Sequence, residues 1–329
     1  MKLKYLITPL CAVLLISAGP ATAQSQSKPI GQITLGWVKS TANLMAFVSP
    51  TISEQYGLKI ESANFNTAVD IATAMISGQV DVGLLTPIHL IRAIDTKIDF
   101  VQIAGNTRGN TGIVIAKKHG VGTDDWGGFK KLMKQKKLRL ASSRGSINEL
   151  LAIAEFARNG VDIDKDLDFV NIANFGQHPQ ALRSGEFDVI VTLEPLAALV
   201  TVDGTGVLLS RPYNSAAGDL NTNYVVRREW LAKNPELAQA FVATLVEASK
   251  RLSGDKKAEL DAAIKLTGMK PDVLTVALSN NRYHLRNGLK QMQELARIAA
   301  ERQYVSRDVS ADLPKAVEDR FLKAAGISE

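Results

Sequence analysis

The chain has 329 residues, of which 46% are hydrophobic and 22% charged, with 39 Lys+Arg against 33 Asp+Glu. This composition excludes an intrinsically disordered protein, which needs low hydrophobicity and high net charge. The length favours two domains over one, and a net charge of +6 argues only weakly for a polyanionic partner. One cysteine cannot form an internal disulfide, and one cysteine with four histidines argues against a structural zinc cluster.

The first residues have the pattern of an export signal. Lys2 opens a basic start, an apolar run extends to Ala18, and Ala21-Thr22-Ala23 supplies small residues at the −3 and −1 positions of a signal-peptidase site. The apolar run is shorter than the roughly 20 residues that span a bilayer, so we expect cleavage after Ala23 rather than an uncleaved anchor. The only cysteine, Cys11, leaves with this segment. The mature protein is therefore expected in the periplasm without a thiol.

Strand-like and helix-like segments alternate along the mature chain. The first half is expected to contain strands at 33–37, 58–64, 80–85, 98–104 and 112–116 and helices at 41–56, 67–77 and 87–95. The pattern continues with helices at 124–135, 146–159 and 179–184 and strands at 138–141, 169–172 and 187–193. Alternation of this kind predicts an α/β fold with mostly parallel, buried strands. The C-terminal part is expected to be helical, at roughly 235–252, 256–267, 271–279, 283–303 and 311–325, with no strand between the helices.

A short sequence echo indicates that the architecture is used twice. The stretch Ser77-Gly78-Gln79-Val80-Asp81-Val82 is matched by Ser184-Gly185-Glu186-Phe187-Asp188-Val189. In each copy we expect the glycine to end a helix in the left-handed conformation and the aspartate to open a buried strand. The motif itself is ordinary turn chemistry, but its recurrence favours two similar α/β lobes.

Polar residues gather where predicted strands lead into helices, which is where ligands bind in open α/β sheets. The candidates in the first lobe are Ser40, Asn66, Thr67, Thr86 and Arg108, and those in the second lobe are Ser142, Ser143, Arg144, Gly145 and Ser146. Hydroxyls, free N–H groups and the helix dipole together favour an anion site. For each loop taken alone, the alternative is ordinary N-capping of a helix by Ser or Thr. Such loops on both lobes favour a ligand site between them.

Four larger side chains have two interpretations each. Arg108 and Arg144 either clamp a carboxylate or sulfonate in a bidentate pair or are solvated surface arginines. Trp37 either forms an apolar wall of the ligand site or packs in the core. Glu194 either accepts an ammonium group of the ligand or caps the helix that follows it.

The motifs of catalysis and of nucleic-acid binding do not occur in the sequence. The histidines are scattered without metal-ligand spacing, and neither a G-x-S-x-G elbow nor a phosphate loop is present. We therefore expect no catalytic residue, no metal and no cofactor. The basic run from Lys130 to Arg139 lacks interleaved aromatic residues, so it is interpreted as a solvated helix face and not as a nucleic-acid site.

Several of these features together resemble one family. They are the export signal, the strand Ile33–Trp37, the stretch Gly57-Leu58-Lys59-Ile60-Glu61, and the Gly…Asp pairs of the two echo motifs. Over about residues 30–250, the sequence is similar to the substrate-binding proteins of ABC importers for aliphatic sulfonates, taurine, nitrate and thiamine-pyrimidine precursors. The resemblance implies a type II periplasmic binding protein, in which a ligand is closed between two α/β lobes joined by a hinge.

The resemblance also implies a division of the chain and a set of ligand loops. The expected division is a signal peptide at 1–23, a first part of lobe I at 24–115, lobe II at 116–213, and a second part of lobe I with C-terminal helices at 214–329. The family's ligand loops fall on Ser40, Asn66-Thr67, Thr86-Pro87, Ser142–Ser146 and Glu194-Pro195. Relatives more often carry an aromatic residue and aspartate where this chain has Leu193-Glu194, so the identity of the ligand, taurine included, does not transfer.

Three functional hypotheses follow from these observations. The leading one is a monomeric periplasmic receptor that binds a small sulfonate- or carboxylate-like anion between its lobes and delivers it to an ABC permease in the inner membrane. The second is a ligand-sensing subunit that reports to a sensor kinase or chemoreceptor. The third is an exported enzyme, which would turn over its ligand.

Overall fold

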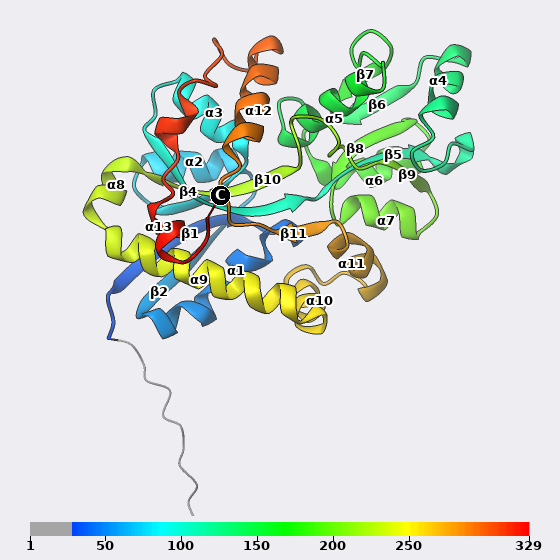
Figure 1. Ribbon diagram of the computed structural model, residues 1–329. Coiled ribbons are helices and arrows are strands. Elements are labelled where there is room, and N and C mark those ends of the chain that lie inside the picture. Colours follow the sequence, from blue (N-terminus) through cyan, green and yellow to red (C-terminus); the bar gives the residue numbers. More distant parts are fainter. Residues whose placement is uncertain (1–27, 329) are drawn as a thin grey trace, which may run out of the picture.

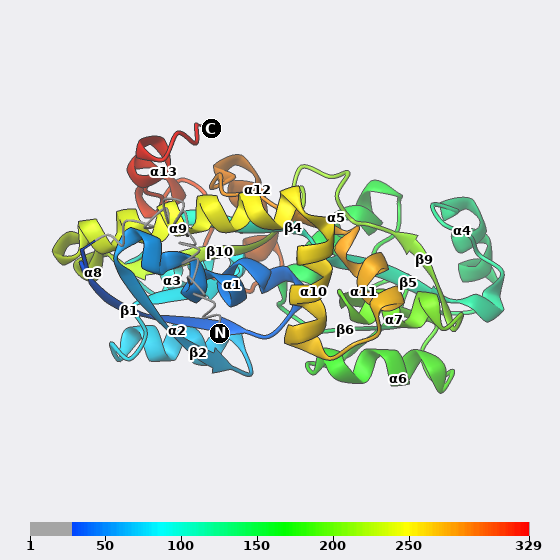
Figure 2. The ribbon, with the colours of Figure 1, turned by 90° about the horizontal axis from the view of Figure 1, so that it is seen from below.

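The computed structural model describes residues 28–328, so the expected export signal lies outside the described residues. The described chain contains two separate β-sheets, each covered by helices on both faces (Figure 1). We call the six-stranded sheet with its helices lobe I and the five-stranded sheet with its helices lobe II. Figure 2 shows the two lobes side by side along the length of the molecule.

Lobe I is built on a sheet with the strand order β11-β4-β10-β3-β1-β2. Its strands are β1 (Gly31–Val38), β2 (Leu58–Phe65), β3 (Val82–Leu85), β4 (Phe100–Gly109), β10 (Leu220–Arg227) and β11 (Asn281–Tyr283). Its helices are α1 (Leu44–Ser53), α2 (Ala68–Ile76), α3 (Pro87–Asp95), α8 (Arg228–Lys233), α9 (Pro235–Gly254), α10 (Lys256–Thr267), α11 (Pro271–Leu278), α12 (Leu289–Glu301) and α13 (Arg320–Ala324). One apolar cluster packs α1 and α9 on one face of the sheet, and another packs α2, α3 and α12 on the other face.

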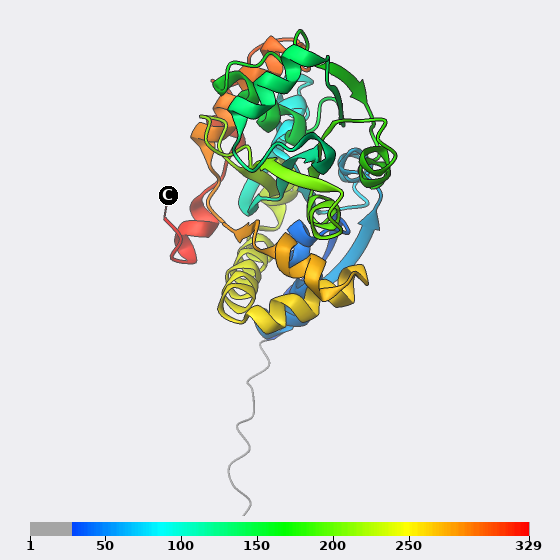
Figure 3. The same ribbon diagram turned by 90° about the vertical axis from the view of Figure 1, so that its right-hand side faces the viewer.

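Lobe II is built on a sheet with the strand order β7-β6-β8-β5-β9. Its strands are β5 (Thr111–Ala116), β6 (Arg139–Ser142), β7 (Asp168–Asn171), β8 (Val189–Leu193) and β9 (Gly206–Ser210). Its helices are α4 (Trp126–Gln135), α5 (Ile147–Arg158), α6 (His178–Arg183) and α7 (Leu196–Val202). Helices α4 and α5 cover one face, and α6 and α7 cover the other. Figure 3 views the molecule from the lobe II end.

The predicted α/β fold is confirmed, with a correction to the strand directions. In lobe I the pairs β1–β2 and β1–β3 are parallel, and in lobe II the pairs β6–β7 and β6–β8 are parallel. Strand β10 runs antiparallel to β3 and β4, and β5 runs antiparallel to β8 and β9. The strands next to the two crossovers thus pair antiparallel in each lobe, β4 with β10 and β5 with β9.

The echo motifs have the same structural role in both lobes. Gly78 has φ +80° and Gly185 has φ +76°, so both use the left-handed conformation expected after a helix. The carboxylate of Asp81 accepts the N–H of Thr34 at 2.8 Å, and that of Asp188 accepts the N–H of Arg139 at 3.0 Å. Each aspartate thus ties the start of its own strand to the neighbouring parallel strand.

The chain crosses between the sheets at two places. Asn110, with φ +65°, is the single residue between β4 of lobe I and β5 of lobe II, and residues 211–219 lead back from β9 to β10. The sheet therefore changes at Asn110, whereas the lobe boundary expected from the sequence follows residue 115. The division into domains itself stays a prediction.

The expectation of an all-helical C-terminal part is wrong at one point. Asn281–Tyr283 forms β11, which pairs antiparallel with β4, and α12 begins only at Leu289. A strand of three residues is too short to leave a period-two pattern in the sequence. Just before it, α11 packs against α7 of lobe II through an apolar cluster that includes Ala198, Val273 and Ala277. None of the helices within residues 28–328 is long and apolar enough to cross a membrane.

The crossover from β4 depends on a glycine, which gives a first prediction. Gly109 has φ +94°, and a Cβ there would lie 2.1 Å from the carbonyl oxygen of Asn280. We expect Gly109→Ala to lower the free energy of unfolding by about 2 kcal/mol or more, because backbone strain and a clash with backbone add up. Urea denaturation measures the change. Gly254→Ala is the control, because the added Cβ would have no atom within 4 Å apart from its chain neighbours and the adjacent backbone of its own helix. Equal stability of the two variants would contradict the close approach.

Candidate functional site

The two lobes meet where β6 ends and α5 begins. Residues 142–146, from the last residue of β6 to the residue before α5, are called the α5 loop below. From lobe I, Nη2 of Arg92 on α3 donates to the carbonyl oxygen of Gly145 at 3.4 Å. A Cβ on Gly145, whose φ is +71°, would lie 2.6 Å from this guanidinium nitrogen. Only glycine therefore lets Arg92 approach the loop so closely.

The α5 loop satisfies most of its own hydrogen bonds. Oγ of Ser146 accepts the N–H of Glu149 at 3.2 Å, and the carboxylate of Glu149 accepts the N–H of Gly145. The N–H of Arg144 donates to Oδ1 of Asn171 at 2.9 Å. Ser146 and Glu149 thus form a variant of the capping box, and the spacing S-x-x-E in the sequence is a signal that could have revealed it. The N-capping interpretation is confirmed for Ser146, and a carboxylate already occupies the positive end of α5.

The carboxylate of Glu149 also contacts lobe I. Its side chain has no exposed surface, and Oη of Tyr304, in the segment after α12, lies 2.8 and 2.9 Å from its two oxygens. Burial raises the pKa of Glu149, while the N–H of Gly145, the hydroxyl of Tyr304 and the nearby Arg144 act in the opposite direction. A single buried carboxylate therefore joins the α5 loop to the other lobe.

Two further arginines lie around this carboxylate. Arg302 of lobe I forms an ion pair with Asp164 of lobe II. The guanidinium of Arg144 lies 4.0 Å from an oxygen of Glu149 and stacks 4.1 Å above the ring centre of Phe169. Together with Arg92 and Tyr304, these charged residues form what we call the interlobe cluster. The members of the interlobe cluster are Arg92, Arg144, Glu149, Asp164, Arg302 and Tyr304. It contains three cations and two carboxylates.

Arg92 is the cation of the cluster without a carboxylate partner. Its side chain is half-buried and forms no ion pair within 4 Å among the described residues. Burial lowers the pKa of Arg92, against the opposite effect of Tyr304 and Glu149. His89, one turn earlier on α3, adds no charge at neutral pH, because burial and Arg92 lower its pKa to about 4. Nothing in the sequence singled out Arg92, since it lies within a helix and not at the end of a strand.

The lobe I residues predicted to bind ligand lie at the strand ends, but their environments differ. Trp37 is 2% exposed and packs in the core, with its ring 6.3 Å from that of Phe47. Thr67 caps α2 by accepting the N–H of Asp70 at 3.1 Å. Asn66 is exposed, and Ser40 and Thr86 are half-buried. The core interpretation of Trp37 and the capping interpretation of Thr67 fit these contacts, and a role of any of the five in ligand binding stays a prediction.

Arg108 lies apart from the α5 loop. Its guanidinium donates to Asp219 at 3.0 Å and to Gln291 at 2.7 Å, within lobe I. It is therefore neither a solvated surface arginine nor a free cation.

In the α5 loop, Ser142 is fully buried and its Oγ has no hydrogen-bond partner among the described residues, whereas Ser143 is half-buried.

Glu194 lies at the crossovers between the lobes. It is 3% exposed; one carboxylate oxygen accepts the N–H of Ala198 at 2.9 Å and the other accepts Nδ2 of Asn280 at 3.1 Å. Its own N–H donates to the carbonyl oxygen of Asn110 at 2.9 Å. The contact with Ala198 is the helix cap expected from the sequence, and the contact with Asn280 adds a link to lobe I. Burial raises the pKa of Glu194 to about 7.

This raised pKa predicts a pH dependence of stability. Between pH 4.5, the ordinary pKa, and about 7, the folded protein keeps a proton on Glu194 that the unfolded chain releases. Unfolding is then favoured by rising pH, so the stability of the wild type relative to Glu194→Gln should fall across this range and level off above it. Urea denaturation at a series of pH values measures the difference. Glu301→Gln, at an exposed carboxyl, is the control; the same pH profile for wild type and Glu194→Gln would contradict the assignment.

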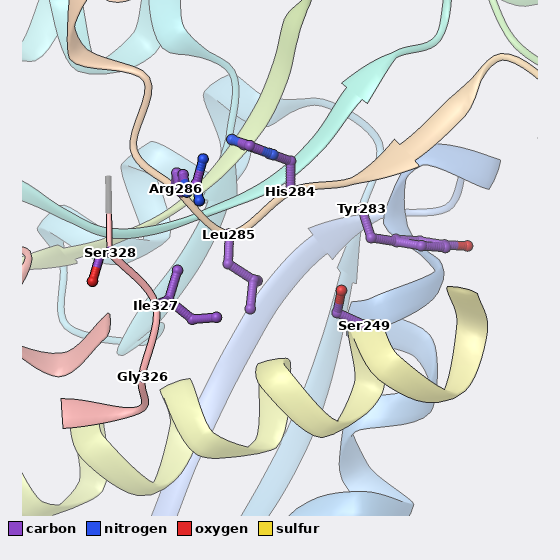
Figure 4. Close-up of a pocket in the computed structure, with 8 residues that line it drawn as sticks. All are labelled: Ser249, Tyr283, His284, Leu285, Arg286, Gly326, Ile327 and Ser328. Atoms are coloured by element: carbon purple, nitrogen blue, oxygen red, sulfur yellow. The ribbon is translucent and has the colours of Figure 1, made fainter. Parts of the chain in front are cut away.

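A surface pocket of about 380 Å³ lies elsewhere, within lobe I (Figure 4). Ser249 of α9, residues 283–286 and residues 326–328 line it. Figure 4 shows Leu285 and Ile327 pointing toward one another across it. No residue of lobe II contributes to this pocket, so it is separate from the interlobe cluster. Within residues 28–328, no group of His, Cys, Asp and Glu side chains is arranged to hold a metal ion.

Solved structures with the same arrangement define the class of fold. The alkanesulfonate-binding protein SsuA from Xanthomonas axonopodis pv. citri bound to MOPS superposes with a TM-score of 0.72 at 18% identity, covering 89% of this chain and 99% of that one. The periplasmic nitrate-binding protein NrtA from Synechocystis PCC 6803 superposes with a TM-score of 0.76 at 14% identity, covering 91% and 89%. The predicted periplasmic binding protein fold of two α/β lobes is thereby confirmed.

Sequence comparison assigns the family. The model of the NMT1-like family matches residues 26–268, so the chain belongs to the NMT1-like family. The putative binding protein YtlA of Bacillus subtilis (strain 168) is 22% identical over 265 residues, which cover 78% of this chain and 76% of that protein. The resemblance to binding proteins of ABC importers seen in the sequence is confirmed by these matches.

Proposed function

We propose that the protein is an exported receptor that binds a small sulfonate- or carboxylate-like anion between its two lobes and delivers it to an ABC permease. The observation that carries this proposal is Arg92, a half-buried guanidinium that reaches the α5 loop and has no carboxylate partner among the described residues. Relatives of the same fold include an alkanesulfonate-binding and a nitrate-binding protein. Their ligands are the class of anion that we propose here.

The charge balance of the interlobe cluster supports an anionic ligand. Two of its cations have carboxylates near them, Arg302 with Asp164 and Arg144 with Glu149, and Arg92 is left over. Arg92 has no ion pair within 4 Å among the described residues, and the attraction of Glu149 does not offset the burial that lowers its pKa, because burial removes water that would otherwise solvate the charge. An anion beside Arg92 would supply the missing charge and could form a bidentate pair with the planar guanidinium.

The proposed position of the anion differs from the one suggested by the helix dipole alone. Glu149 already accepts the N–H of Gly145, so the start of α5 offers less positive potential than an uncapped helix. We therefore propose that the anionic head lies on the Arg92 side of the α5 loop, toward α3. The buried hydroxyl of Ser142 and the half-buried Ser40 and Thr86 are proposed to supply further hydrogen bonds.

Binding in this scheme changes no covalent bond. The ligand favours the closed arrangement only through its larger affinity for that arrangement, and contacts with both lobes at once supply such a difference. A permease that binds the closed form preferentially would then distinguish loaded from empty receptor. The protein is accordingly proposed to be a receptor and not an enzyme, and intact ligand should be recovered after binding.

The proposal predicts the effect of removing the Arg92 charge. Thermal-shift screening of the mature protein against alkanesulfonates, small carboxylates and nitrate should identify at least one anion that raises Tm. For that anion, Arg92→Gln should weaken binding by about 1.5–3 kcal/mol, the usual value of a hydrogen bond to a charged group. Isothermal titration calorimetry measures the loss.

The control is an arginine of similar chemistry outside the cluster. Arg297 on α12 is about half-exposed and pairs with Glu294, so Arg297→Gln should leave the affinity unchanged. Absence of any anion that raises Tm, or wild-type affinity in Arg92→Gln, would contradict the proposed site.

A further inference from the structure

The contact between Tyr304 and Glu149 joins the two lobes directly. The residues are 155 positions apart, one in the lobe I segment after α12 and the other in the first turn of α5 in lobe II. The phenol oxygen lies 2.8 and 2.9 Å from the two carboxylate oxygens, so its single proton is shared between them. Burial and the carboxylate raise the pKa of Tyr304, which keeps the phenol protonated as a donor.

The same carboxylate reaches into the α5 loop. Glu149 accepts the N–H of Gly145, whose carbonyl oxygen faces Arg92. A continuous chain of hydrogen bonds therefore runs from Tyr304 through Glu149 and Gly145 to Arg92. It begins and ends in lobe I and passes through the α5 loop of lobe II.

Other contacts hold α5 and α12 together around this chain. Ile147, Leu150 and Leu151 of α5 share an apolar cluster with Met292 and Leu295 of α12. The ion pair between Arg302 and Asp164 lies at the C-terminal end of α12. In Figure 1, α5 and α12 lie on one side of the crossover strands and the α7–α11 contact on the other. The side that carries the α5 loop is thus fastened separately from the crossovers.

We propose that Tyr304 and Glu149 form a latch that fastens the α5 loop to lobe I before any ligand binds. Breaking the latch frees the loop from Arg92 and allows the two lobes to separate on this side. Tyr304 and Glu149 act as positioning residues, because they hold Gly145 and need not touch the ligand. One further step rests on the proposed function: the protein binds its anion only while the α5 loop is fastened. A variant without the latch should then bind the anion more weakly, by the same factor as the decrease in the fraction of molecules whose loop is fastened.

The latch is tested without ligand, by the distance between two spin labels. The expected mature chain contains no cysteine, so Lys131→Cys on α4 and Glu236→Cys on α9, both exposed, give a single labelled pair across the lobes. In this background Tyr304→Phe, which removes only the hydroxyl, should shift the distribution to longer and broader distances. Tyr283→Phe is the matched control, since Tyr283 lies on β11 within lobe I, and it should leave the distribution unchanged.

Hydrogen–deuterium exchange gives a second readout on the folded variants. Amides of residues 142–149 should exchange several-fold faster in Tyr304→Phe than in the wild type or in Tyr283→Phe, because the loop is no longer fastened. An unchanged distance distribution together with unchanged exchange in this segment would overturn the latch. Both measurements are made on ligand-free protein, so they can fail while an anion still binds, and they can succeed when no anion binds.

Discussion

Burying a carboxylate costs several kcal/mol unless hydrogen bonds and nearby cations compensate it, and the site between the lobes is organised around such a group. The carboxylate of Glu149 accepts hydrogen bonds from the N–H of Gly145 and the hydroxyl of Tyr304, and the positive charge of Arg144 stabilises its ionised form. Two of these partners, Gly145 and Arg144, belong to the α5 loop of lobe II, and the third, Tyr304, comes from lobe I. The position of the α5 loop relative to lobe I therefore depends on one fully buried side chain.

Charge connects this arrangement to the proposed function. A carboxylate at the start of α5 weakens the anion site that the helix would otherwise offer, yet the cluster as a whole has more cations than carboxylates. The excess is located on Arg92, across from the loop and on the other lobe. An anion placed beside Arg92 and next to the loop would contact both lobes, which is the condition for a ligand to stabilise their closed arrangement. Selectivity would then depend on how well the ligand tolerates the nearby carboxylate.

The sequence was sufficient to predict the two-lobe α/β fold and the role of the echo motifs, because both follow from local periodicity and turn chemistry. Gly78 and Gly185 end helices in the left-handed conformation, as their sequence context requires. The short strand β11 was missed, since three residues leave no period-two pattern. The pairing of Arg108 with Asp219 was missed for another reason: the partners are separated by 111 positions, and only the fold brings them together. Arg92 and Tyr304 were missed for the same reason, because only the fold brings them to the α5 loop. The capping pair Ser146…Glu149, in contrast, could be recognised in the sequence.

The central claim is that a small anion lies between the lobes beside Arg92. A crystal structure of the mature protein with the anion that gives the largest thermal shift tests it most directly. The account predicts electron density for the anion within hydrogen-bonding distance of the Arg92 guanidinium, between α3 and the α5 loop. Density in the lobe I pocket lined by Ser249 and Arg286, or a bound anion that does not contact Arg92, would contradict it.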